Sequence, residues 1–235
     1  PILVAEGLRK AYGETRLLDG VDLSVHQGER IGLVGNNGSG KSTLARILVG
    51  EEQPDDGRVA RRREASIRYL PQEPHLASGR RAREIVLEGL DDWARAFERH
   101  EELSRLIVAQ EPGWEAYTEP QAEAAQEVER LGGWEHSRRA DVLLQQLGLR
   151  ALDRSVDQMS GGERRRVALA RLLVEEPTLA ILDEPTNHLD ADTIEWLETH
   201  LREQYGGALI LITHDRYVLD RVVNRTLEID QGKVN

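Results

Sequence analysis

The most constraining feature of this sequence is the stretch GNNGSGKST at residues 35–43, which fits the pattern G-x-x-x-x-G-K-[ST]. It directly follows RIGLVG at residues 30–35, a short apolar run typical of a buried parallel strand. It leads into STLARILVG at residues 42–50, whose apolar residues have helical spacing. A strand, a glycine-rich turn and a helix form the context that the pattern requires, so the stretch predicts a phosphate-binding loop in an α/β fold.

The residue types of this loop suggest how it would hold a nucleotide and Mg²⁺. Glycines let backbone N–H groups converge on phosphate oxygens. Lys41 would bring a positive charge to the β- and γ-phosphates, and Ser42 would offer its hydroxyl to Mg²⁺. The structural alternative is a plain turn before a capped helix. The expected nucleotide-binding residues of the loop are Gly35, Asn36, Asn37, Gly38, Ser39, Gly40, Lys41, Ser42 and Thr43.

A pair of carboxylates follows a second apolar run, TLAILDEP at residues 178–185. Asp183 ends the predicted strand, where an unpaired carboxylate is costly to bury and a hydrated Mg²⁺ would compensate for it. Glu184 comes next and could polarise the water that attacks the phosphate. Without the phosphate loop, both would be taken for ordinary loop or helix-capping residues.

Three single residues are candidates for the same site. Gln72 follows a predicted strand and could bind Mg²⁺ or the attacking water. His214 comes after the apolar run 208–213, and the carboxyl ends of parallel strands are where α/β folds bind ligands. Tyr12 lies in a predicted turn and could stack on adenine. Taken alone, each of the three is an ordinary structural or surface residue.

Strands that alternate with helices predict an α/β fold with a mostly parallel core sheet. Residues 80–158 differ, because they are rich in Glu, Arg, Ala and Leu with helical periodicity. We expect them to form an inserted helical lobe that divides an ATP-binding core into residues 1–79 and 159–235. Three of the four tryptophans, Trp93, Trp114 and Trp134, lie in this lobe, where packing explains them better than a ligand cage.

Composition narrows the class of protein. The net charge of −11 argues against a general polyanion binder. The absence of cysteine excludes disulfides and thiolate metal sites, and a sequence without long apolar runs predicts a cytoplasmic protein with no membrane segment. Local arginine clusters would suit nucleic-acid phosphates, although solvated surface charge explains them more simply. These clusters are Arg61–Arg63, Arg80 with Arg81 and Arg83, and Arg138–Arg139.

The stretch MSGGERRR at residues 159–166 predicts an unusual helix start. Ser160 and Glu163 have the spacing of a capping box. Gly161 and Gly162 weaken the first turn, yet they leave bare backbone N–H groups, which form an anion site at a helix N-terminus.

Along nearly its whole length the sequence resembles the ATP-binding cassette (ABC) family. The family's motifs occur in order: Tyr12, the phosphate loop, Gln72, MSGGE at 159–163, LAILDEP at 179–185, NHLD at 187–190 and His214. The resemblance implies a P-loop nucleotide-binding domain with an N-terminal antiparallel β-subdomain and ATPase activity with ATP and Mg²⁺. It also implies that Glu184 is the general base and that His214 positions the water and the γ-phosphate.

The resemblance further implies a partner. In ABC proteins the signature residues, here Ser160, Gly161 and Gly162, bind the γ-phosphate of an ATP held by another cassette. Asp190 would lie at the same interface. The partner would be a second cassette outside this chain or a second copy of it, with ATP bound between the two.

Some details resemble one branch of the family. Glu163 replaces the glutamine usual in transporters, and DEPTNHLD and THDRYVLD are similar to the ABC-F branch of soluble tandem cassettes. DDGRV, HEELSRLI and IEWLETHL are most similar to its Uup type. This implies an N-terminal cassette of a protein that acts on ribosomes and RNA or on branched DNA repair intermediates. The nucleotide-binding subunit of a transporter is the alternative.

Overall fold

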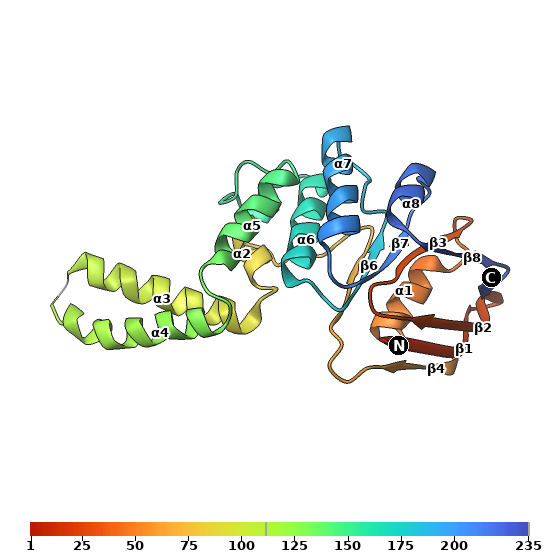
Figure 1. The fold of residues 1–235 in the computed structure, drawn as a ribbon, viewed down its shortest axis with the longest axis horizontal. Helices are drawn as coiled ribbons and strands as arrows, with labels where there is room; N and C mark the ends of the chain where they lie inside the picture. Colours follow the sequence, from red (N-terminus) through yellow and green to blue (C-terminus); the bar gives the residue numbers. More distant parts are fainter. Residues whose placement is uncertain (111, 235) are drawn as a thin grey trace. The chain divides into compact units, whose positions relative to one another are not determined.

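The computed structural model describes residues 1–110 and 112–234 and divides into two compact units (Figure 1). The first unit comprises Pro1–His75 and Glu176–Asn235, and the second comprises Leu76–Glu175. The expected lobe, residues 80–158, lies within the second unit, which also includes the helix that starts at the signature stretch. Glu111 and Asn235, which fall in the expected ranges 80–158 and 159–235, lie outside the described residues.

The first unit contains two sheets, as the sequence predicted. A three-stranded antiparallel sheet has the order β2-β1-β4, and a six-stranded sheet has the order β5-β6-β7-β3-β8-β9, parallel except for the terminal β8–β9 hairpin. The strands are β1 (Leu3–Tyr12), β2 (Thr15–Val25), β3 (Arg30–Gly35), β4 (Asp56–Arg61), β5 (Ile67–Leu70), β6 (Leu179–Asp183), β7 (Ala208–Ile212), β8 (Arg225–Asp230) and β9 (Lys233–Val234). The expected α/β fold with a mostly parallel core is therefore confirmed.

Helices cover both faces of the larger sheet. β6 and β7 are buried at every residue, as expected for central parallel strands. α1 (Lys41–Val49) shares one apolar core with both sheets and so packs between them. On the opposite face of β3, a Cβ added to Gly32 would lie 2.8 Å from the Leu219 side chain of α8 (Arg216–Val222), so this glycine lets α8 approach the sheet closely.

The helix that precedes β7 changes its geometry before it ends. α7 covers Ala191–Thr199 and then passes into a short π-helix, His200–Gln204. Arg30 accounts for the change, because its guanidinium donates to the carbonyl oxygens of Leu201 at 3.0 Å and Tyr205 at 2.5 Å. A distant arginine thus binds carbonyl groups that a continuing α-helix would keep for itself.

The second unit is helical. It contains α2 (Ala82–Leu87), α3 (Asp91–Ala109), α4 (Thr118–Arg130), α5 (Glu135–Gln146) and α6 (Gly161–Glu175), with 3-10 turns at Trp114–Tyr117 and Val156–Gln158. α3 and α4 lie side by side as a long hairpin (Figure 1). Trp93 is 3% exposed, stacks on Phe97 with ring centroids 4.7 Å apart, and donates from Nε1 to the Gly133 carbonyl oxygen at 2.8 Å. Packing within the lobe is therefore confirmed for Trp93.

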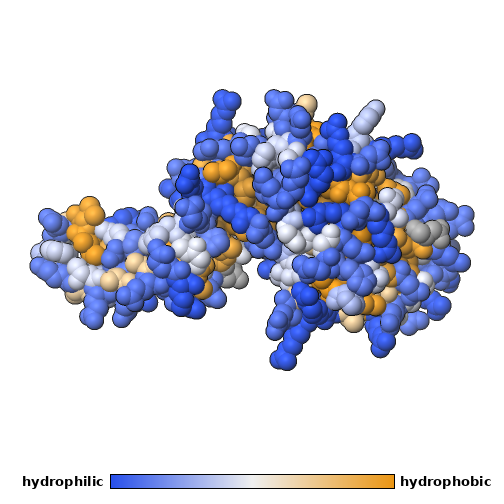
Figure 2. All heavy atoms as spheres, viewed as in Figure 1, coloured by the Kyte–Doolittle hydropathy of each residue, from blue (hydrophilic) through white to orange (hydrophobic). Residues whose placement is uncertain are grey.

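The visible surface is mostly hydrophilic, in keeping with the high content of charged residues (Figure 2). Within the described ranges, no helix is both long enough and apolar enough to cross a membrane.

Candidate active site

The loop after β3 has the geometry of a phosphate cradle. Gly40 precedes α1 with φ 101°, and Gly35 has φ 149°, where a Cβ would lie 2.5 Å from a backbone carbonyl oxygen of β8. Both positions therefore require glycine. Lys41 folds back over the loop, and its Nζ donates to the carbonyl oxygens of Gly35 at 2.8 Å and Asn36 at 2.9 Å.

Two polar groups in this loop fit a bound anion. Burial lowers the pKa of the Lys41 ammonium, although the carboxylates of Asp183 and Glu184 oppose this shift. The Ser39 hydroxyl is buried and finds no hydrogen-bond partner within the described part of the chain. Buried polar groups are rarely left unpaired in native proteins, so the orphaned hydroxyl and the buried cation suit a loop that binds phosphate.

Asp183, the last residue of β6, is the centre of a buried cluster. Its side chain is enclosed, with the residue only 3% exposed. The hydroxyls of Ser42 and Tyr69 both donate to Asp183 Oδ2, at 2.6 Å and 2.9 Å. Burial, together with the neighbouring Asp183 carboxylate, raises the pKa of the Tyr69 hydroxyl. Tyr69 was not predicted, although it is a polar side chain in a strand that ends just before Gln72.

The donor set at Asp183 fits a hard divalent cation. Carboxylate and hydroxyl oxygens are the ligands that Mg²⁺ prefers, and it usually takes its other ligands from phosphates and water. Among the described residues, no group of three or more His, Cys, Asp or Glu forms a complete metal site. Ser42 and Asp183 therefore suit a metal that arrives with a nucleotide rather than one held by protein alone.

Glu184 has a constrained backbone and a defined set of donors. Its φ of 51° is unusual for a residue other than glycine and is often found at functional sites. The Thr213 hydroxyl donates to Glu184 Oε2 at 3.1 Å, and the His214 backbone N–H donates to Oε1 at 3.2 Å. The His214 ring nitrogen Nε2 lies 3.7 Å from the same oxygen. Glu184 and His214 are thus brought together as expected, and the buried Thr213, which sequence analysis missed, orients the carboxylate.

A cavity of about 520 Å³ lies at the phosphate loop, and a separate cavity of about 740 Å³ lies in the second unit. The cavity at the phosphate loop is the relevant one here. It opens at the carboxyl ends of the parallel strands, where α/β folds bind ligands. It is lined by Leu17, Asn37, Gly38, Gly40, Lys41, Ser42, Thr43, Gln72, Asp183, Glu184, Asn187 and His214. Leu17 was not predicted, and Asn187 was noted only as the first residue of the NHLD motif. All these residues belong to the first unit.

Tyr12 is not among the residues that line this cavity. It ends β1, and the residue is 48% exposed. Its hydroxyl is hydrogen-bonded to the Glu52 carboxylate, and Lys10 Nζ lies 5.6 Å from its ring centroid. An exposed ring held in place at its hydroxyl end suits stacking, and the contact with adenine stays a prediction.

The signature residues Ser160, Gly161 and Gly162 lie at the start of α6 in the second unit. The capping box is confirmed, because the Ser160 N–H donates to Glu163 Oε2 at 2.8 Å and the Glu163 N–H donates to Ser160 Oγ at 3.2 Å. The hydrogen bond from the Ser160 backbone lowers the pKa of the Glu163 carboxyl despite partial desolvation. A Cβ at Gly161 would meet nothing within 4 Å, so the space beside the first turn is open.

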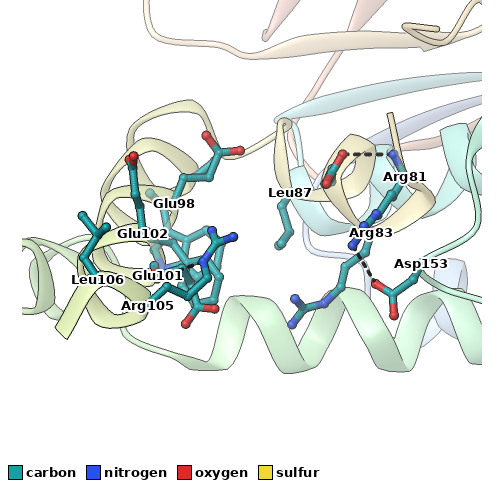
Figure 3. Close-up of a pocket in the computed structure, with 13 residues that line it drawn as sticks. Arg81, Arg83, Leu87, Glu98, Glu101, Glu102, Arg105, Leu106 and Asp153 are labelled. Carbon is teal, nitrogen blue, oxygen red and sulfur yellow. Dashed lines mark hydrogen bonds and ion pairs between the residues drawn. The ribbon is translucent and has the colours of Figure 1, made fainter. Parts of the chain in front are cut away.

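The larger cavity lies in the second unit, between α2 and α3 (Figure 3). Arg81, Arg83 and Asp153 lie at one side of it, and Glu98 and Leu106 lie at the other (Figure 3). Arg83 forms an ion pair with Asp141 at 2.7 Å, and Arg81 lies 3.9 Å from Asp153. Mixed charges that pair with one another do not form an anion site.

Several arginines of these clusters are engaged within the protein. Arg80 pairs with Glu88 at 2.8 Å, and Arg61 donates from Nε to the Leu48 carbonyl oxygen at 3.0 Å, close to the end of α1. Arginines that hold their own fold are less available to nucleic-acid phosphates, so the interpretation as structural and surface charge is favoured over a nucleic-acid interface.

The fold and the cavity together define a P-loop nucleotide-binding domain. The chain matches the model of the ABC transporter family over residues 18–187. It therefore belongs to the ABC transporter family, as an ATP-binding domain of the ABC ATPase type.

The curated relatives are longer proteins. The chain is 37% identical over 233 residues to the uncharacterized ABC transporter ATP-binding protein YfmR of Bacillus subtilis, covering 99% of this chain and 37% of YfmR. It is 38% identical over 232 residues to the energy-dependent translational throttle protein EttA of Mycobacterium tuberculosis H37Rv, covering 99% of this chain and 41% of EttA. The chain thus spans about two fifths of the length of these relatives.

Solved structures share the fold. The ATP-binding subunit of an ABC transporter aligns with a TM-score of 0.71 at 24% identity, covering 100% of this chain and 88% of that one. A dimeric ATP-binding cassette, MJ0796, bound to ADP and phosphate in a post-hydrolysis state, aligns with a TM-score of 0.68 at 24% identity, covering 99% and 96%. At this identity the likeness confirms the expected ABC fold with its N-terminal antiparallel sheet.

Proposed function

We propose that the first unit binds ATP with Mg²⁺ in the 520 Å³ cavity and hydrolyses it to ADP and phosphate. The observation that carries the proposal is the convergence of three kinds of group in one cavity. Lys41 supplies a cation in a phosphate cradle, Asp183 with Ser42 supplies oxygen ligands, and Glu184 supplies a carboxylate oriented by hydrogen bonds. Phosphoryl transfer relies on this combination of positioning and charge stabilisation.

The residues have separate binding roles in this proposal. Lys41 and the N–H groups of the loop bind the β- and γ-phosphates. Ser42, Asp183 and Gln72 would hold Mg²⁺, which when bound neutralises charge that develops on the phosphate oxygens. Tyr12 would stack on the adenine ring from outside the phosphate cavity.

Glu184 is the proposed general base. It takes a proton from the water whose oxygen bonds to the γ-phosphorus while the bond to the β-phosphate oxygen breaks. Thr213 and the His214 N–H hold the carboxylate by its two oxygens, which fixes its direction before water arrives. The exposed His214 ring, 3.7 Å from Glu184, would position the water and the γ-phosphate.

The site would be completed by a second cassette. The open first turn of α6 at Ser160, Gly161 and Gly162 would bind the γ-phosphate of the partner's ATP, and Asp190 would lie at the same interface. Sedimentation of the Glu184→Gln variant with and without Mg-ATP tests whether a second copy suffices. A nucleotide-dependent dimer supports self-association. A monomer under both conditions shows that a different cassette is required, and turnover of the isolated chain is then expected to be weak.

For the whole protein we propose an ABC-F type, with this chain as the N-terminal, Uup-like cassette of a soluble cytoplasmic protein. Similarity to relatives named translational throttle proteins over 92–99% of this chain favours the ribosome as target, with branched DNA as the other candidate. The full-length Glu184→Gln protein should co-sediment with ribosomes in ATP but not in ADP. Tighter nucleotide-dependent binding to a four-way DNA junction than to ribosomes would favour the DNA target.

A nucleotide-binding subunit of a transporter is the second candidate, because the relative YfmR is named as an ABC transporter ATP-binding protein. The two candidates differ in their partner. Co-purification of the full-length protein with an integral membrane permease would support the transporter subunit and exclude the ribosomal assignment.

A further inference from the structure

Tyr69 contacts Asp183, and the proposed mechanism gives this side chain no role. It lies on β5, which pairs in parallel with β6, and its register partner on β6 is Ile181, two residues before Asp183. Its hydroxyl donates to Asp183 Oδ2 at 2.9 Å, the oxygen that also accepts from Ser42 at 2.6 Å. Two donors from different elements therefore converge on a single oxygen of a buried carboxylate.

Two hydrogen bonds to one oxygen restrict how the carboxylate can turn. Ser42 has two duties in the proposed site, because its hydroxyl both donates to Asp183 and offers a lone pair to the metal. Tyr69 needs to supply only the donor, and a tyrosine hydroxyl carries its proton at neutral pH. Groups that hydrogen-bond to metal ligands orient them, and their removal typically costs 10–100-fold in metal affinity or activity.

We infer that Tyr69 is a positioning residue of the metal site, whose hydroxyl fixes the Asp183 carboxylate in the orientation that holds the Mg²⁺ of bound ATP. The inference rests on the proposed function, because it presupposes that ATP enters the phosphate-loop cavity with a divalent metal. Tyr69 itself does not touch the nucleotide in this assignment, and it acts only through Asp183.

The test compares two conservative variants. Tyr69→Phe removes the hydroxyl and keeps the ring. Tyr205→Phe is the control, because Tyr205 lies in the first unit and, like Tyr69, donates its hydroxyl to a protein oxygen, the Pro177 carbonyl oxygen at 2.5 Å. The dissociation constant of a fluorescent methylanthraniloyl-ATP is measured for each protein in excess Mg²⁺ and in EDTA. The ratio of the two constants reports the metal's contribution to binding.

The expected result is selective. Tyr69→Phe should weaken binding in Mg²⁺ by about tenfold or more and change binding in EDTA by less than about twofold. Tyr205→Phe should lower the unfolding temperature and leave the ratio at its wild-type value. A wild-type ratio in Tyr69→Phe, or equal weakening in both buffers, would overturn the inference, since the tyrosine would then be a packing residue or have no role.

Failure of the inference differs from failure of the proposed function. If wild type and Lys41→Ala bind the ATP analogue equally, the cavity is not the nucleotide site and both proposals fail. If Lys41→Ala binds the ATP analogue weakly but the wild-type affinity is the same in Mg²⁺ and in EDTA, the proposed metal site is wrong and the inference fails with it. If Mg²⁺ raises the affinity of wild type for the ATP analogue and raises that of Tyr69→Phe by the same factor, only the role of Tyr69 is wrong.

Discussion

The substitution Glu184→Gln separates a chemical role of this carboxylate from a structural one. The glutamine amide is nearly the same size as the carboxylate and keeps one oxygen. That oxygen can still accept a hydrogen bond from the His214 backbone N–H, which lies 3.2 Å from Oε1 of Glu184. The Thr213 hydroxyl, 3.1 Å from Oε2, can rotate to accept from the new amide group. The fold and ATP binding should therefore survive, whereas the basic lone pair that would receive a proton from water is lost.

The size of the expected effect follows from these contacts. Complete loss of one hydrogen bond to a charged group costs about 1.5–3 kcal/mol, or roughly 10–150-fold in rate, and the amide keeps both hydrogen bonds in a weaker, neutral form. Loss of general-base catalysis costs about 10²–10⁴-fold, or about 2.7–5.4 kcal/mol of transition-state stabilisation. A decrease of about a thousandfold or more therefore exceeds what the loss of one hydrogen bond of Glu184 can produce.

The assay is phosphate release at saturating Mg-ATP, measured together with the affinity for a fluorescent ATP analogue. Glu195→Gln on the exposed face of α7 makes the same chemical change away from the cavity and serves as the control. We expect Glu184→Gln to bind ATP like wild type and to release phosphate at least a hundredfold more slowly. Turnover within about threefold of wild type would remove Glu184 from the role of general base.

Four further changes test other parts of the structure. Lys41→Ala removes the buried cation of the phosphate cradle and should weaken ATP binding by about 10–100-fold in a fluorescence titration, since hydrogen bonds to charged groups contribute about 1.5–3 kcal/mol; unchanged affinity would contradict the assigned site. Gly207→Ala places a Cβ 2.3 Å from a backbone carbonyl oxygen and should lower the free energy of unfolding by about 1–3 kcal/mol, measured by calorimetry. Gly206→Ala is the control, because a Cβ there meets nothing within 4 Å. Equal melting temperatures for the two variants would show that the crowding at Gly207 is relieved. Ser160→Ala should cost about 1 kcal/mol by loss of the helix cap. The pKa of Glu163 is lowered in the folded state, so the ionised carboxylate stabilises the fold above the unfolded pKa of about 4.3, and this stabilisation is lost as pH falls through the lower folded pKa. Glu163→Gln should therefore flatten the fall in unfolding free energy at acid pH. An unchanged fall would argue against the capping contact.

The parts of the site that were predictable are those carried by local sequence. The phosphate loop, β6 with its terminal Asp183, and the capping box at Ser160 depend on turn chemistry, apolar runs and helix-capping rules that act over a few residues. The helical character of residues 80–158 was also recognisable from composition and periodicity. Tertiary contacts decided where α7 gives way to a π-helix, because the arginine that binds the carbonyl groups there is about 170 residues away in the chain.

The sequence by itself determined which chemical groups this protein has, in what order, and at the ends of which strands, because each motif is a local pattern with a local physical cause. Only the tertiary structure decided which groups meet. Asp183 and Ser42 are 141 residues apart, and Tyr69 reaches Asp183 across 114 residues, yet all three share one carboxylate oxygen. The parallel pairing of β5 with β6 brings the tyrosine there, and the burial of Asp183 makes its hydroxyl donors necessary. Neither strand pairing nor burial is written in a short stretch of residues, so Tyr69 and Thr213 entered the site only with the fold.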